Sequence, residues 1–149
     1  MSVALNIAKF ISDIFFDFIL SEIESRKNSL ISKLKFNKCK KKIKESIEKY
    51  ILQNDGSILT SSTFEKYLKY QKPTVKIQYY VLEFNSSDLD EKAFIYECIN
   101  ECREYFSISN CDFTPQDECI LKDFYQKLLI IFNEFAINQL LSLIHISEP

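Results

Sequence analysis

The sequence predicts an all-α fold, a single irregular bundle of five or six helices. One observation is the scarcity of glycine: Gly56 is the only glycine among 149 residues, and only three residues are proline. Tight hairpins and loops that approach a ligand closely depend on glycine, so folds built on them are disfavoured. A second observation is that apolar residues recur at helical spacing along most of the chain. The hydrophobic content of 46% and the charged content of 27% are typical of one globular domain.

The first predicted helix covers residues 4–36 and the second covers residues 39–53, with Asn37 as the stop between them. The first helix repeats its apolar residues at i, i+3, i+4 and i+7 intervals: Ile7, Phe10, Ile11, Ile14, Phe15, Phe18 and Ile23. The inward residues of the second helix are Ile43, Ile47, Tyr50 and Ile51.

The strongest turn signal follows at Asn54-Asp55-Gly56. A short extended segment is expected over residues 57–60. Ser61 or Ser62 then caps a third helix, and Glu65 stands at capping-box spacing from Ser62.

Residues 73–84 fit either a strand or a helix. The alternation of Val75, Ile77, Tyr79 and Val81 is typical of a strand. Pro73 also suits the first position of a helix. Because no partner strand is evident elsewhere, the helix is favoured.

Two further helices complete the predicted bundle. Ser87 or Asp88 caps the first, over residues 89–106, whose inward residues are Phe94, Ile95, Cys98, Ile99, Cys102 and Tyr105. Thr114 as N-cap and Pro115 at the first position open the last helix. Its apolar stripe is Leu121, Phe124, Leu128, Ile131, Phe132 and Phe135.

The final nine residues differ from the rest of the chain. They interrupt the helical stripe and contain the only histidine, His145. The string from Ser142 to Pro149 resembles a translated sequencing adapter. We therefore expect residues 1–140 to form the helical domain and residues 141–149 to be a non-native tail, with the natural chain continuing past Leu140.

The sequence predicts a cytoplasmic protein with reduced thiols and no bound metal or other cofactor. Lys9, Asp13 and Asp17 interrupt the apolar N-terminal segment, which is typical of neither a secretory signal nor a membrane span. The cysteines are odd in number: Cys39, Cys98, Cys102, Cys111 and Cys119. The last four could form a zinc site, but they lack two closely spaced ligand pairs, so a role as small apolar core residues is favoured.

Seven lysines within twelve residues form a basic cluster from Lys33 to Lys44. On a helix they would surround most of the circumference and leave Cys39 and Ile43 facing inward. The candidate polyanion contacts are Lys38, Lys40, Lys41, Lys42 and Lys44. A solvated helix end, or one that faces the acidic second half of the chain, is the favoured interpretation.

No catalytic residue is predicted, and the segment is not expected to be an enzyme. The chain has no Ser/His/Asp or Cys/His arrangement, no P-loop and no dinucleotide fingerprint. The acidic pair Glu97 and Glu101 stands at i, i+4, which is typical of an exposed helix face.

A resemblance adds a biological setting. The run from Ile43 to Tyr80 places the segment Gln53-Asn54-Asp55-Gly56-Ser57-Ile58-Leu59-Thr60 between two helices. This resembles the N-terminal helical domains that precede the nucleotide-binding module of bacterial NACHT- and STAND-type ATPases. The segment from Phe113 to Glu118, which opens the last helix, is similar. The resemblance covers about residues 40–140, contains no Walker motif and carries over no functional residue. It implies a bacterial cytoplasmic protein, often of phage defence, whose helical segment senses or relays while ATP binds downstream.

Two functions are therefore expected from the sequence. The leading one is a non-catalytic regulatory or protein-interaction domain at the N-terminus of a longer bacterial protein. Its partner would be another protein or a downstream domain of the same chain, and not a membrane. The alternative is a nucleic-acid-binding helical domain that uses the Lys33–Lys44 cluster.

Overall fold

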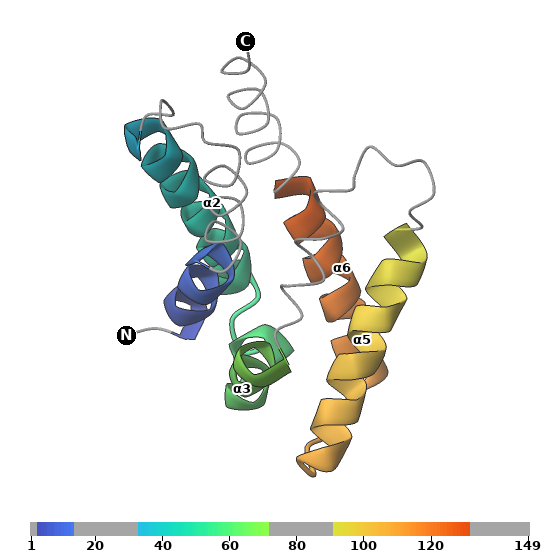
Figure 1. Ribbon diagram of the computed structural model, residues 1–149. Helices are drawn as coiled ribbons and strands as arrows, with labels where there is room; N and C mark the ends of the chain where they lie inside the picture. The colour runs from blue at the N-terminus through green and yellow to red at the C-terminus, as the bar shows by residue number, and fades with distance from the viewer. Residues whose placement is uncertain (1–2, 14–32, 72–90, 132–149) are drawn as a thin grey trace.

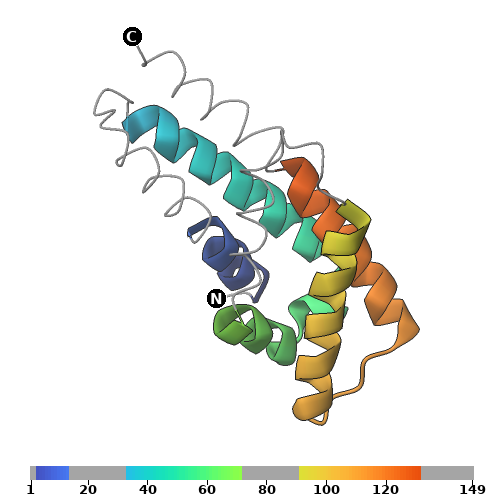
Figure 2. The ribbon, with the colours of Figure 1, turned by 45° about the vertical axis from the view of Figure 1, so that its right-hand side comes forward.

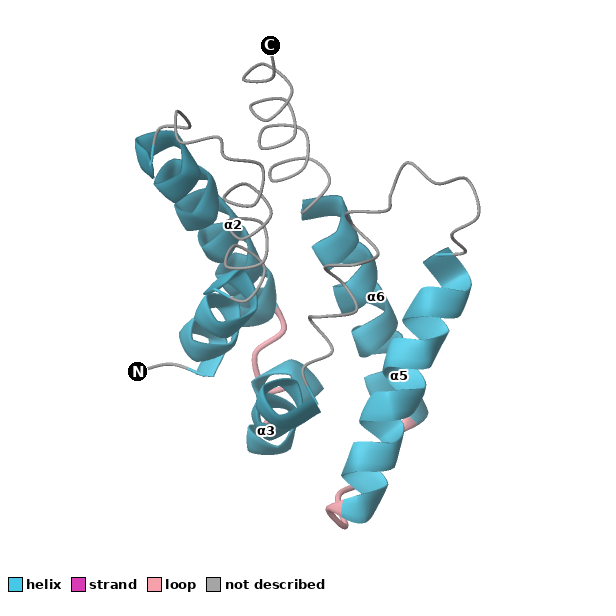
Figure 3. Cartoon of the chain, in the orientation of Figure 1, coloured by secondary structure: helices cyan, strands magenta, loops and turns pink. Residues whose placement is uncertain are grey.

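The computed structural model describes residues 3–13, 33–71 and 91–131, and these residues are helical almost throughout (Figure 1). The elements are a helix over residues 3–13, α2 (Lys33–Gln53), a 3-10 helix η1 (Ile58–Thr60), α3 (Ser62–Gln71), α5 (Glu91–Ile108) and α6 (Pro115–Ile131). No strand occurs within these ranges, as Figure 3 shows, so the all-α prediction is confirmed. The choice between helix and strand for residues 73–84 and the predicted tail at 141–149 lie outside the described residues.

The bundle is arranged around α6. This helix contacts α5, η1 and α2, while α3 packs against η1 and α5. Helices α2 and α5 lie on opposite sides of α6 in the view of Figure 1, and Figure 2 shows the C-terminal end of α2 approaching α6. Helices α5 and α6 run antiparallel, as the colour order along the chain shows in Figure 1. The two long outer helices therefore each keep one face away from the shared core.

Aromatic rings connect these helices in the core. The Phe124 ring centroid of α6 lies 6.1 Å from that of Tyr50 in α2 and 5.8 Å from that of Phe64 in α3. Phe124 and Leu128 are each only 1% exposed, which confirms that this part of the predicted α6 stripe is buried. The rest of the stripe, at Phe132 and Phe135, lies outside the described residues.

Helix α2 begins earlier than the sequence predicted. The predicted stop at Asn37 is wrong, because α2 runs without interruption from Lys33 to Gln53. Asn37 is exposed on the helix surface, so its amide needs no buried partner, and neither glycine nor proline follows it. Later in the same helix, Cys39 and Ile43 are buried and pack α2 against the core.

The turn after α2 is confirmed, but the segment that follows it differs from the prediction. Gly56 adopts a φ of +82°, which only glycine reaches without strain. Residues 58–60 form a 3-10 helix in place of the expected extended segment. Ser57 Oγ accepts a hydrogen bond from the Leu59 amide at 3.2 Å, which satisfies a donor that an extended segment would leave open.

Side-chain hydrogen bonds cap the N-terminal ends of α3 and α6. Ser61, not Ser62, caps α3: its Oγ accepts from the Phe64 amide at 3.2 Å. At α6 the predicted cap is confirmed and is reciprocal. Thr114 Oγ1 accepts from the Asp117 amide at 3.1 Å, and Asp117 Oδ2 accepts from the Thr114 amide at 2.9 Å.

Helix α5 ends in a Schellman motif that starts the turn into α6. Asn110 takes a left-handed φ of 56°. The Cys111 amide donates to the Phe106 carbonyl at 2.9 Å, and the Asn110 amide donates to the Ser107 carbonyl at 3.1 Å. These bonds satisfy the last carbonyls of the helix and reverse the chain, which sets α5 and α6 side by side.

Candidate functional site

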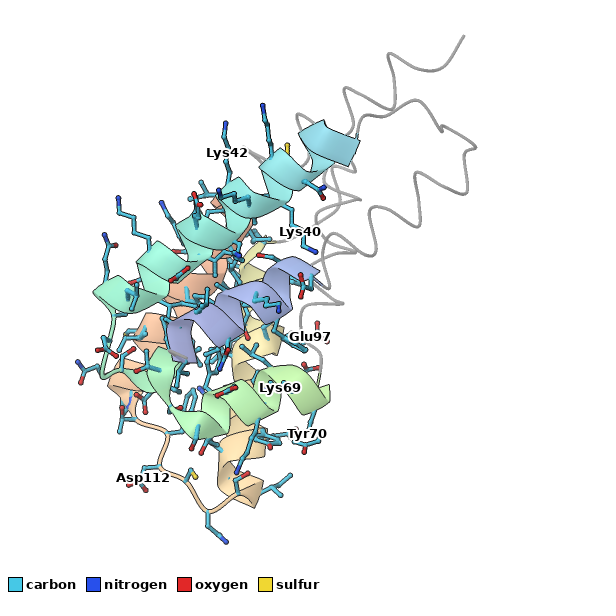
Figure 4. All side chains as sticks on the ribbon, turned by 90° about the vertical axis from the view of Figure 1, so that its left-hand side faces the viewer. Lys40, Lys42, Lys69, Tyr70, Glu97 and Asp112 are labelled. Atoms are coloured by element: carbon cyan, nitrogen blue, oxygen red, sulfur yellow. The ribbon has the colours of Figure 1, made fainter. Side chains whose placement is uncertain are left out.

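The structure divides the predicted polyanion contacts into two groups along α2. The exposed group consists of Lys38, Lys41 and Lys42. Lys40 and Lys44 are half-buried, and Lys40 Nζ lies 2.8 Å from Asp13 Oδ1 of the N-terminal helix. Figure 4 shows Lys42 pointing away from the bundle and Lys40 on the side of the N-terminal helix. Only the first group is open to a partner from outside.

The inward side of this segment is apolar, as predicted. Cys39 and Ile43 are 5% and 0% exposed. Burial raises the pKa of the Cys39 thiol, an effect that nearby Lys42 partly offsets. The Cys39 thiol therefore stays neutral and packs as an apolar group in spite of the lysines around it.

The four cysteines considered for zinc are separated in the fold. Cys98 and Cys102 are buried in α5, and burial raises the pKa of the Cys102 thiol strongly. Cys111 Sγ lies 3.3 Å from Thr63 Oγ1 of α3, and Cys119 is exposed on α6. Across residues 3–13, 33–71 and 91–131, no three His, Cys, Asp or Glu side chains converge in a way that could hold a metal ion.

A buried pair of tyrosines lies beside these thiols in the core. The Tyr67 hydroxyl donates to the Cys98 carbonyl at 3.3 Å. Among the described residues the buried Tyr125 hydroxyl has no hydrogen-bond partner of normal geometry, although it lies close enough to the Tyr67 hydroxyl to interact with it. Burial raises the pKa of both hydroxyls, so both stay protonated in the folded chain. Their role is to join α3, α5 and α6 inside the core.

A groove of about 480 Å³ lies between α5 and α6. Its apolar floor comes from Ile95 and Ile99 of α5, both nearly buried. Tyr96 lines one wall and is 62% exposed, which is unusual for so large an apolar side chain. The charged and polar rim consists of Glu91, Lys92, Glu118, Lys122 and Gln126, with Cys119 beside it.

At one end of this groove, an ion pair connects α5 to α6 and a cation–π contact connects α5 to the turn between them. Arg103 Nη2 of α5 lies 3.0 Å from Glu118 Oε1 of α6. The Arg103 guanidinium also lies 5.3 Å from the centroid of the Phe113 ring, in the turn between the helices. These contacts, with the Schellman turn, set the spacing of α5 and α6 and so the width of the groove.

This groove was not predicted from the sequence. Ile95 and Ile99 were identified as inward residues, but Tyr96 and Lys122 were not singled out. An available signal was the helical position of Tyr96, 100° from Ile95 and therefore off the buried stripe. The partner side of the groove could not be inferred, because it depends on how α6 packs against α5.

The comparisons with known proteins add no relative. The chain matches no family model, and neither the curated proteins nor the solved structures include a significant match to it. Within the described ranges, no helix combines the length and the apolar character needed to cross a bilayer.

Proposed function

We propose that this chain is a non-catalytic protein-interaction domain whose contact surface is the groove between α5 and α6. The observation that carries the proposal is the combination of an apolar floor with an exposed tyrosine, Tyr96, inside a charged rim. Tyrosine is enriched among residues that dominate binding energy, particularly where an apolar centre has a polar surround.

The occupant that this groove fits best is an amphipathic helix of a protein partner. A groove between two helices receives the apolar stripe of a third helix, anchored by a few side chains. The anchor would lie over Ile95 and Ile99, and an acidic residue one turn away would meet Lys122. The partner is another protein or a downstream domain of the same chain, in the bacterial cytoplasmic setting that the resemblance to NACHT- and STAND-type ATPases implies. None of the five cysteines, all of which the structure describes, is in a disulfide, as such a compartment favours.

A displayed library of amphipathic helical peptides tests this proposal. We expect selected peptides to require an apolar anchor and to protect Cys119, at the groove edge, from alkylation. Tyr96→Ser and Lys122→Glu should each weaken binding roughly tenfold or more. Tyr70→Ser is the matched control, because Tyr70 is 75% exposed on α3 and does not line the groove. Selected peptides that tolerate both groove variants would contradict the proposal.

Polyanion binding through α2 is a second candidate, favoured by the shared exposure of Lys38, Lys41 and Lys42. Each phosphate contact on duplex DNA would add about 0.9 to the slope of log affinity against log salt concentration. Replacing these three lysines by glutamine should therefore flatten the slope by about 2.7 if all three contact phosphates. Lys40→Gln is the control, since Lys40 pairs with Asp13. A slope that none of these changes alters would remove this candidate.

A further inference from the structure

An ion pair in the α5–α6 hairpin fixes which residues of the two helices lie level with one another. The helices run antiparallel (Figure 1), and Arg103 Nη2 of α5 lies 3.0 Å from Glu118 Oε1 of α6. Both helices rise about 1.5 Å per residue, so the residue four positions before Arg103 is level with the residue four positions after Glu118. Ile99 of α5 and Lys122 of α6 therefore lie at about the same level, and both line the groove.

Two of the charged residues that line this groove, Lys122 of α6 and Glu91 of α5, are exposed and available to a partner. Neither side chain takes part in an ion pair or a hydrogen bond among the described residues. The other two charged residues differ, because Glu118 pairs with Arg103 and Lys92 has a partner within the chain. Within the described part of the chain, the groove thus keeps one cation and one anion that no internal charge neutralises.

These two charges lie at equal distances from the middle of the groove. Glu91 precedes Ile95 by four residues, and Lys122 is level with Ile99, four residues after Ile95. Each charge is therefore about 6 Å from the level of Ile95, in opposite directions along the hairpin. A twofold axis that crosses the two helices at the level of Ile95 would bring Lys122 of each copy to Glu91 of the other. The groove is thus complementary in charge to a second copy of itself.

The uncharged groove residues near this axis also suit contact with their own copies. Tyr96 follows Ile95 by one residue and is 62% exposed, so the tyrosine rings of two copies would meet beside the axis. Paired aromatic rings attract each other and cover the apolar floor. Gln126, four residues after Lys122, lies about level with Ile95. Its amide both donates and accepts, so it can pair with the same amide across a twofold axis.

We infer that a second copy of this chain occupies the groove, so that the protein forms a twofold dimer of α5–α6 hairpins. This inference rests on the proposed function and names the partner that the groove takes. The contact uses the same surface of both copies and leaves neither groove open, so assembly stops at two. Two hairpins packed face to face form a four-helix arrangement, in which the apolar residues of all four helices share one interior.

Charge also selects the direction of the axis. A twofold axis parallel to the helices would set Lys122 level with Lys122 of the second copy, and Glu91 level with its own copy, so like charges would repel. The axis that crosses the helices replaces both repulsions with ion pairs. An unrelated helix would need an acidic residue and a basic residue about 12 Å apart with apolar residues between them, a pattern that the groove already contains.

Sedimentation velocity of the 149-residue chain over a range of protein concentrations tests the inference. We expect a monomer–dimer equilibrium with no larger species. Lys122→Glu and Glu91→Lys should each weaken dimerisation roughly tenfold or more, because each sets like charges against one another across the contact. A 1:1 mixture of the two variants should form a heterodimer about as stable as the wild-type dimer, since both like-charge pairs then become opposite. The chain that carries both substitutions should dimerise for the same reason.

Matched controls separate this contact from general charge effects. Glu104→Lys and Lys127→Glu make the same charge changes at exposed positions of the same helices outside the groove, and should leave dimerisation unchanged. Circular dichroism checks that each variant is folded. A chain that stays monomeric at all concentrations, or a variant mixture that does not associate, would overturn the inference.

The two proposals fail in distinguishable ways. Selected peptides that bind a monomeric chain, and bind Tyr96→Ser and Lys122→Glu more weakly, would keep the groove as an interaction surface and overturn the second copy as its partner. A dimer that neither Lys122→Glu nor Glu91→Lys weakens would place the contact elsewhere and overturn the inference as well. A dimer that follows the charge exchange, and that a selected peptide dissociates, would support both.

Discussion

Helices α2 and α6 pack against each other around Phe124, yet they begin in different ways. Helix α6 starts with a reciprocal cap between Thr114 and Asp117, and two acidic residues occupy its first turn. Helix α2 has no acidic residue in its first turn, the position where an acidic side chain would complement the helix dipole. The difference indicates that local signals set the start of α6, whereas burial of one face maintains α2.

The buried faces of the two helices differ as well. The buried residues of α2 are Cys39, Ile43, Ile47 and Ile51, one in each turn. Helix α6 buries Phe124 and Tyr125 among its leucines and therefore brings a polar hydroxyl into the core. Helix α2 thus depends largely on the packing of its aliphatic face, and α6 combines packing with a strong local start.

The largest expected effect comes from removing the Phe124 side chain, through which α6 packs against α2. Phe124→Ala should lower the free energy of unfolding by about 3–5 kcal/mol, because it removes a buried ring between Tyr50 and Phe64. Hydrogen exchange should show faster opening in α2 than in α6, because the first turn of α2 contains no acidic residue to complement the helix dipole. Chemical denaturation measures the free energy of unfolding. A loss below about 1 kcal/mol would show that neighbouring side chains fill the space or that Phe124 does not hold α2 and α6 together.

Alkaline pH should destabilise the α6 side of the core. Burial raises the pKa of Tyr67, Tyr125 and Cys102 in the folded chain, so these groups release protons first in the unfolded chain. The unfolded state then binds fewer protons, and the free energy of unfolding falls as pH rises past about 9–10. Each group that titrates only when unfolded contributes about 1.4 kcal/mol per pH unit.

Tyr125→Phe provides the check on this pH dependence. Within the described part of the chain the Tyr125 hydroxyl has no hydrogen-bond partner of normal geometry, so its removal should cost at most about 1 kcal/mol at neutral pH. The same variant should make the alkaline slope shallower. Equal slopes for the wild type and Tyr125→Phe would show that Tyr125 ionises in the folded chain.

A smaller effect is expected at the capped start of α6. Thr114→Ala should cost about 1 kcal/mol, because the Asp117 amide loses its acceptor. Thr114→Ser keeps an oxygen in place and should restore most of the loss. Thermal or urea denaturation resolves a difference of this size. If alanine and serine behave alike, the reciprocal bond does not contribute to the start of α6.

The same contrast explains how much could be predicted from the sequence. The start of α6 and the turn at Gly56 were predicted correctly, because each depends on residues adjacent in the chain. The start of α2 was wrong, since the stop signal at Asn37 was weaker than the burial that continues the helix past it. The α5–α6 groove could not be predicted, because its two sides meet only when the hairpin packs.

The smallest expected effect has the opposite sign and tests the continuity of α2 directly. Asn37 lies exposed within α2, four residues after its start, and asparagine is a poorer helix former than alanine. Asn37→Ala should therefore raise the free energy of unfolding by a few tenths of a kcal/mol, up to about 0.5 kcal/mol. A helix that truly ended at Asn37 would use the asparagine as a cap, and alanine there would destabilise it. Asn37→Gly separates these cases, because glycine weakens a continuous helix by about 1 kcal/mol relative to alanine but suits a helix end. If the Asn37→Gly variant were more stable than the Asn37→Ala variant, α2 would start after Asn37 in solution, and its lysine-rich first turn would not be helical.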